Sequence, residues 1–177
     1  PGHDFRHYVR VVQAAERAKF DAVFLADNSA VIGGGDRKDV LSRTAAAGFF
    51  EPITLLSALA AVTEHIGLIA TVTTTYNEPY NVARKFVSLD HISGGRSGWN
   101  LVTSDNAAEA LNFGRDHHIG HAERYSRARE FQQVVTGLWD SWEDDALVGD
   151  RGRGLFAHPE NVHSLEHHGA RFHNRGP

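Results

Sequence analysis

The stretch Asp21-Ala22-Val23-Phe24-Leu25-Ala26-Asp27 is a short apolar run enclosed by two acidic residues. Its apolar residues are continuous rather than alternating, which is typical of a parallel strand buried on both faces. Apolar residues recur at helical spacing over residues 4–20, immediately before this run, and Asp4 can cap that helix. A helix followed by a buried strand is the repeating unit of α/β proteins, so this stretch indicates the fold class.

The same unit recurs further along the chain. Glu51-Pro52 opens a second helical pattern, with proline at the first helical position, where its missing N–H costs nothing. We expect this helix to stop at His65-Ile66-Gly67, with glycine just past its end. An apolar strand is expected to follow over residues 68–72.

A third helix is expected over residues 82–91 and a third strand over residues 99–103, separated by the helix-breaking Ser93-Gly94-Gly95. Residues 121–142 carry an apolar stripe at helical spacing, which predicts a long fourth helix. We expect a long loop over residues 30–50, which contain three consecutive glycines, and loop or irregular helix over residues 109–120.

Alternation of helices with short buried strands predicts a parallel sheet with right-handed crossovers. We expect the strands near residues 22–27, 68–73 and 98–103 to be neighbours in that order, with helices outside. A full (β/α)8 barrel needs about 250 residues, and the same strands could belong to an open doubly wound sheet. We expect one domain over residues 1–177, in which the polar, Gly-rich residues 143–177 form an excursion rather than a core element.

The composition excludes several classes of protein. The 177 residues include no cysteine, which rules out disulfides, thiolate metal sites and a cysteine nucleophile. The net charge of -4 gives no indication of nucleic-acid or membrane-surface binding. Apolar runs fall short of the roughly 18 residues of a membrane span, and no secretory signal pattern is visible. We therefore expect a cytoplasmic protein.

Polar side chains follow each predicted strand, where parallel α/β folds build their sites. Asp27, Asn28 and Ser29 follow the first strand, Thr73 to Thr75 end the second, and Asn100, Thr103 and Ser104 end the third. The alternative is that they are turn residues and helix caps.

His121 and Tyr125 lie at positions i and i+4 near a helix start, so both are on one face and could bind a phosphate. The alternative interpretation of this pair is a surface histidine and a tyrosine at the edge of the core.

Three other motifs do not support a function. The twelve histidines lack a His-Glu-x-x-His pattern, so we expect no metal site. Gly33-Gly34-Gly35 lacks the Lys-Ser/Thr of a phosphate loop, and Gly95-Arg96-Ser97-Gly98 is not a Gly-x-Ser-x-Gly nucleophile elbow. Nucleotide hydrolysis and serine hydrolysis are therefore rejected.

Several motifs, in order and along nearly the whole chain, resemble the bacterial-luciferase-like flavin monooxygenases, in the branch that includes nitrilotriacetate monooxygenase. The strongest is Leu89-Asp90-His91-Ile92-Ser93-Gly94-Gly95-Arg96-Ser97-Gly98-Trp99-Asn100-Leu101-Val102-Thr103-Ser104. The others are Phe24-Leu25-Ala26-Asp27, Phe50-Glu51-Pro52, Tyr80-Asn81-Val82-Ala83-Arg84, Asn112-Phe113-Gly114, Arg124-Tyr125 and Leu138-Trp139-Asp140-Ser141-Trp142.

The resemblance implies the N-terminal half of a TIM-type (β/α)8 barrel that uses reduced FMN (FMNH2) and O2. A separate NAD(P)H:flavin reductase would supply the reduced flavin, and the substrate would be a small organic molecule such as an aminopolycarboxylate or organosulfur compound. A homo-oligomer is expected. The implied cofactor-binding residues are Asp27 and Thr73 at the flavin ring, Asn100 and Val102 beside it, and His121 and Tyr125 at the ribityl-phosphate end; no catalytic residue is assigned.

Two other functions stay open at the level of sequence. One is a deazaflavin-dependent oxidoreductase of the same superfamily, against which the Trp99-Asn100-Leu101-Val102-Thr103-Ser104 pattern argues. The other is a non-catalytic half-barrel that survives as a binding or dimerising remnant. Binding of FMN would distinguish both from the monooxygenase.

Overall fold

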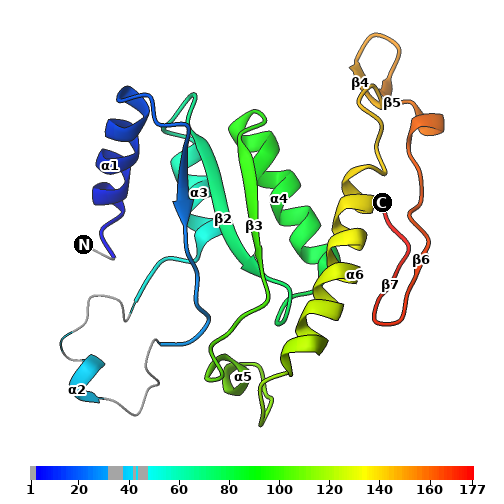
Figure 1. The fold of residues 1–177 in the computed structure, drawn as a ribbon. Coiled ribbons are helices and arrows are strands. Elements are labelled where there is room, and N and C mark those ends of the chain that lie inside the picture. The colour runs from blue at the N-terminus through cyan, green and yellow to red at the C-terminus, as the bar shows by residue number, and fades with distance from the viewer. Residues whose placement is uncertain (1–2, 32–37, 42, 44–47) are drawn as a thin grey trace.

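The computed structural model describes residues 3–31, 38–41, 43 and 48–177. Its centre is a parallel sheet of β1 (Ala22–Leu25), β2 (Gly67–Thr73) and β3 (Ser97–Val102), in the order β1-β2-β3 (Figure 1). The predicted strands, their direction and their order are therefore confirmed.

Four longer helices accompany the sheet. In Figure 1, α3 and α4 lie behind the sheet, α1 flanks β1, and α6 flanks β3. Among the described residues, no helix covers the face of the sheet toward the viewer in Figure 1. This one-sided cover matches the expectation of a partial barrel with outer helices. The helices are α1 (Phe5–Arg17), α3 (Pro52–Ala60), α4 (Pro79–Ser93) and α6 (His121–Trp139).

Carboxylate caps start the first two of these helices; the Asp4 cap was predicted from the sequence, and the Glu51 cap was not. The Asp4 side chain accepts from the Arg6 N–H at 3.0 Å. Glu51 Oε1 and Oε2 accept from the Ile53 and Thr54 N–H groups at 3.0 and 2.7 Å. Each cap satisfies backbone donors that have no partner inside the helix.

The predicted end of the second helix is wrong. Helix α3 ends at Ala60, and Gly67 is the first residue of β2 rather than a helix cap. Its N–H donates to Asp21 O at 2.9 Å, and a Cβ at this position would lie 3.1 Å from the Cβ of Ala22. Glycine is needed here because β1 and β2 approach closely, which sequence spacing alone cannot distinguish from a helix terminus.

The break after α4 is confirmed, since Gly94 and Gly95 have φ angles of 69° and 86°. The next residue, Arg96, turns its guanidinium under the amino ends of the strands. All five of its N–H donors bind oxygens: Ser93 O at 2.7 Å, Thr63 Oγ1 and O at 3.1 and 3.0 Å, Ile66 O at 2.8 Å and Ala60 O at 3.2 Å. This one side chain joins the ends of α3 and α4 to the start of β2.

Residues 143–177 form two small antiparallel sheets and a 3-10 turn. Part of this segment does belong to the core, contrary to expectation: Ala146 is fully buried, and Phe172 is 5% exposed and packs edge-on against Phe131. Glu130 of α6 holds Phe172 there by accepting from the N–H groups of Arg171 and Phe172 at 2.9 and 2.8 Å. The elements are β4 (Leu147–Asp150), β5 (Leu155–Ala157), η2 (Pro159–Asn161), β6 (His167–His168) and β7 (His173–Asn174).

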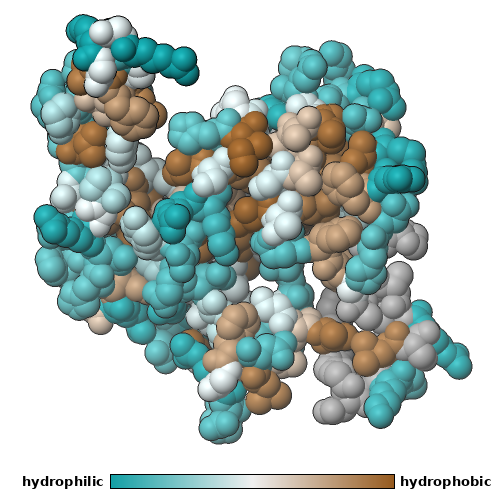
Figure 2. Space-filling view, turned by 180° about the vertical axis from the view of Figure 1, so that it is seen from behind, coloured by the Kyte–Doolittle hydropathy of each residue, from teal (hydrophilic) through white to brown (hydrophobic). Residues whose placement is uncertain are grey.

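The hairpin of β4 and β5 projects from the body of the protein and exposes apolar side chains. Leu147 is 51% exposed and Phe156 is 71% exposed. Figure 2, which views the molecule from behind, shows apolar atoms gathered on this projection. The surface is therefore available for contact with another polypeptide.

Two predicted loops contain short helices: α2 (Lys38–Leu41) falls within residues 30–50, and α5 (Glu109–Asn112) within residues 109–120. Gly33-Gly34-Gly35 lies outside the described residues. No helix in the described ranges is long and apolar enough to cross a membrane.

Candidate functional site

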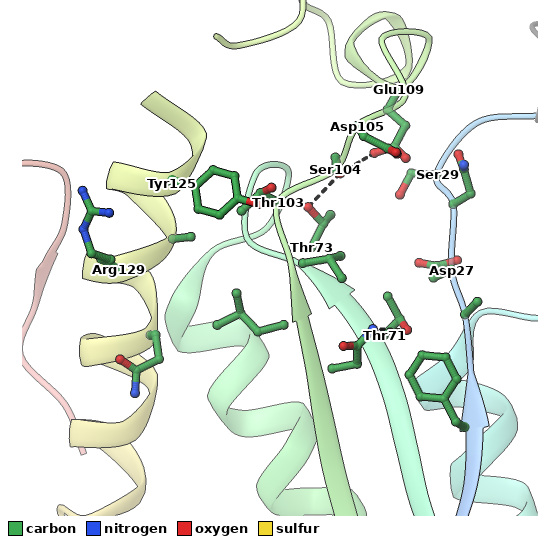
Figure 3. Close-up of a pocket in the computed structure, with 18 residues that line it drawn as sticks. Asp27, Ser29, Thr71, Thr73, Thr103, Ser104, Asp105, Glu109, Tyr125 and Arg129 are labelled. Carbon is green, nitrogen blue, oxygen red and sulfur yellow. Dashed lines mark hydrogen bonds between the residues drawn. The ribbon is translucent and has the colours of Figure 1, made fainter. Parts of the chain in front are cut away.

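A cavity of about 680 Å³ opens at the carboxyl ends of β1, β2 and β3, with the first half of α6 as its other wall (Figure 3). The strand-end residues that the sequence singled out lie together here. Five of the six predicted cofactor-binding residues line the cavity: Asp27, Thr73, Asn100, Val102 and Tyr125.

The sixth predicted residue, His121, does not line this cavity. Its ring lies beside that of Tyr125, with the ring centroids 4.6 Å apart, as expected for positions one turn apart on a helix. Tyr125 is 48% exposed, and Figure 3 shows its ring pointing toward the strand ends. In the same view, the Arg129 guanidinium points away from them.

Asp27 forms the wall that follows β1. Partial burial raises the pKa of its carboxyl above the ordinary value, and repulsion from Glu51 and Glu109 acts in the same direction. A hydrogen bond from the Asn28 backbone opposes this shift in pKa. The cavity is therefore an environment that disfavours added negative charge near Asp27.

The loop after β1 is tied to the loop after β3. Asn28 Oδ1 accepts from the Ala30 N–H at 3.1 Å and from Asn106 Nδ2 at 3.0 Å. Asn112 Nδ2 donates to Ser29 O at 2.8 Å. Asn28 and Ser29, which the turn interpretation also accommodates, thus help to close one side of the cavity.

Hydrogen-bonded side chains also link β2 and β3 at their ends. Asn100 Nδ2 donates to Thr71 Oγ1 at 3.0 Å. Ser104 Oγ lies 2.8 Å from Thr73 Oγ1 and 2.6 Å from Glu109 Oε2. Ser104 has a left-handed backbone, with φ of 55°, which places its hydroxyl between these two partners (Figure 3).

Helix α6 is fixed to the end of β2 by Arg127. Its Nε donates to Thr74 O at 2.9 Å and its Nη2 donates to Asn77 O at 2.9 Å. The guanidinium also lies 4.6 Å from the centre of the Phe172 ring. Burial lowers the pKa of Arg127 from its ordinary value, and the charge of Glu78 opposes this shift.

A second polar group lies near the start of α6. The Tyr76 hydroxyl is 2.7 Å from His118 Nδ1, and the Tyr76 ring stacks on Phe113 with centroids 4.6 Å apart. Burial raises the pKa of Tyr76, and the negative charge of Glu109 adds to the effect. This contact anchors the segment that leads into His121.

Sequence reasoning missed several residues that line the cavity. Thr71 lies two residues before the predicted Thr73, on the same face of β2, which a period of two would have indicated. Arg129 and Gln132 continue the spacing of His121 and Tyr125 along α6. Glu109 carried no sequence signal, because it is one acidic residue in a segment with no clear periodicity.

Among the residues that the structure describes, no three histidine or acidic side chains gather as a metal site would require. Several of the histidines instead lie near carboxylates, as His163 Nε2 does at 2.6 Å from Glu143 Oε1.

Comparison with known proteins places this arrangement in a family. The family model for luciferase-like monooxygenase matches residues 1–175. Nitrilotriacetate monooxygenase component A from Aminobacter aminovorans is 53% identical, over 98% of this chain and 40% of its own length. The chain therefore belongs to the luciferase-like monooxygenase family, as the resemblance indicated.

Solved structures agree with this assignment. The crystal structure of a long-chain alkane monooxygenase superposes with a TM-score of 0.89 at 37% identity, covering 98% of this chain and 41% of that one. A riboflavin lyase solved with modified FMN and riboflavin gives a TM-score of 0.88 at 36% identity, with 98% and 39% covered. The chain spans about 40% of the length of these relatives, and its α/β fold is part of their TIM-type barrel.

Proposed function

We propose that the protein containing this chain is a monooxygenase that uses reduced FMN and O2 to oxidise a small organic substrate. The observation that carries the proposal is the cavity at the carboxyl ends of three parallel strands, in a chain of this family. Relatives named for nitrilotriacetate and dibenzothiophene sulfone favour an aminopolycarboxylate or an organosulfur compound as substrate. A separate NAD(P)H:flavin reductase would supply the reduced flavin.

The donors and acceptors of the site fit FMN. A flavin ring has an edge of alternating donors and acceptors, and the strand ends offer carboxylate, hydroxyl and amide groups from Asp27, Thr73 and Asn100. Val102 would pack beside the ring. When bound, reduced FMN supplies the electrons that activate O2.

The phosphate of FMN would lie at the start of α6. Within the described part of the chain, no side chain caps this helix at Gly120, so its first N–H groups remain available to an anion. His121 and Tyr125 stand on the same face of its first turns and can donate to phosphate oxygens. The position of His121 outside the cavity lining agrees with a role at the end of the ligand rather than at its ring.

The chain's own residues would bind and orient the flavin and keep water from its reacting face. We further propose that residues 1–177 form one domain with residues 143–177 as an excursion from the barrel. A cytoplasmic location follows from the need for reductase and pyridine nucleotide. The exposed apolar hairpin supports a homo-oligomer.

The test is a titration of the full-length protein with FMN, followed by turnover with a flavin reductase, NADH and candidate substrates. We expect His121→Ala and Tyr125→Ala to weaken FMN binding with little effect on riboflavin, which lacks the phosphate. Asp27→Asn and Asn100→Ala should lower turnover as well. Binding of a deazaflavin in place of FMN would favour the related oxidoreductase, and no flavin binding at all would favour the non-catalytic remnant.

A further inference from the structure

Glu109 is a buried carboxylate that the proposed flavin site does not directly use. The residue is 4% exposed, although it lies in the short α5 helix near the surface of the fold. Its Oε2 accepts from Ser104 Oγ at 2.6 Å. A carboxylate removed from water is costly unless it has a strong partner, so its retention at this place calls for a role.

The direction of the hydrogen bonds in this group follows from what each atom can donate. Glu109 Oε2 accepts from Ser104 Oγ, so the single hydroxyl proton of Ser104 goes to Glu109. Ser104 Oγ is then an acceptor for its other neighbour, and the Thr73 hydroxyl donates its proton across the 2.8 Å contact. The Thr75 N–H donates to Thr73 Oγ1 at 3.1 Å.

These contacts leave one acceptor position of the Thr73 hydroxyl for a ligand. A hydroxyl has one donor and two acceptor positions; the donor and one acceptor position are occupied by Ser104 and the Thr75 N–H. Since Thr73 lines the cavity, what it can still offer a ligand there is an acceptor. The left-handed backbone of Ser104 is a conformation that persists only where its surroundings fix it, which agrees with a defined direction of bonding.

We propose that Glu109 is a positioning residue which, through Ser104, holds the Thr73 hydroxyl as a hydrogen-bond acceptor toward an N–H on the ring of the bound flavin. The inference rests on the proposed function. Without the carboxylate, Ser104 could turn its proton toward Thr73, and Thr73 would then present a donor to the cavity. An N–H of the ligand would meet an O–H instead of a lone pair.

The test measures binding to the full-length protein of lumiflavin, which has only the ring, and of FMN. We expect Glu109→Leu to weaken both ligands by about three- to tenfold, the loss of one hydrogen bond. Ser104→Ala breaks the same path of hydrogen bonds and should cause the same loss of affinity. This variant therefore provides the test if Glu109→Leu does not fold. Glu109→Gln keeps an acceptor oxygen and should restore most of the affinity.

A double-mutant cycle with Thr73→Val separates this role from general support of the fold. In the Thr73→Val background, Glu109→Leu should change lumiflavin affinity by less than about twofold, because the hydroxyl it positions is gone. A purely structural role would give the same loss in both backgrounds and would overturn the inference. Lumiflavin binding that is unchanged in both Glu109→Leu and Ser104→Ala would also overturn the inference, but it would leave the proposed function standing. If the parent protein binds no flavin, both the inference and the proposed function are wrong.

Discussion

Replacing Arg96 with lysine tests whether one guanidinium holds the amino end of the sheet together. Arginine uses five N–H donors here, on four carbonyl oxygens and the Thr63 hydroxyl. Lysine has three donors, so at least two acceptors lose their partner. Hydrogen bonds to charged groups contribute about 1.5–3 kcal/mol each, which gives a loss of about 3–6 kcal/mol in the free energy of unfolding.

The assay is urea-induced unfolding of the full-length Arg96→Lys protein against the parent, with attention to the midpoint and the slope. Arg10→Lys is the matched control, since Arg10 makes an exposed 3.9 Å ion pair with Asp4, and its replacement should change stability by less than about 0.5 kcal/mol. If Arg96→Lys unfolds within about 0.5 kcal/mol of the parent, the reasoning that these bonds act together is wrong.

Three further changes test other parts of the structure. Glu16 accepts from three consecutive N–H groups of residues 64–66, which lowers its pKa to about 2. Glu16→Gln should therefore lower the free energy of unfolding in urea above pH 4.5, and the difference from the parent should shrink as the pH falls toward 2. A difference that does not depend on pH would show that the charge of Glu16 is not what stabilises this contact. The raised pKa of Asp27 means that the ionised carboxylate destabilises the folded protein. Asp27→Asn should therefore raise the melting temperature slightly at pH 7 and less at pH 3, and it should lower turnover. A lower melting temperature of the variant at pH 7 would contradict this prediction. Gly67→Ala should destabilise by about 1–3 kcal/mol in the same unfolding assay, because its Cβ would meet Asp21 O and Ala22 Cβ at 3.1 Å; a neutral result would show that β1 and β2 can separate.

The strands and their order could be predicted because each is a continuous apolar run between polar residues, and parallel neighbours follow from the intervening helices. The strand-end site followed from the same logic, since it depends on topology alone. Gly67 was misassigned because glycine serves both helix ends and close strand contacts. Phe172 was missed because one aromatic residue in a polar segment gives no periodicity.

The cavity residues beyond the strand ends were harder to find from sequence. Glu109 contacts the strand end through Ser104, in a hydrogen bond that depends on the left-handed backbone of Ser104, which local sequence does not specify. The partnership of Asn28 with Asn106 joins residues 78 positions apart. Contacts of this kind arise only once the sheet has brought separate loops together.

Arg127 has a mechanical consequence for the site. Because Arg127 bonds the Thr74 and Asn77 carbonyls on one side and packs on Phe172 on the other, it ties α6 to the end of β2. We expect this link to restrict movement of α6 relative to the strand ends. The distance between Tyr125 and Thr73 should then change little when a ligand binds, so this distance would select ligands by their length.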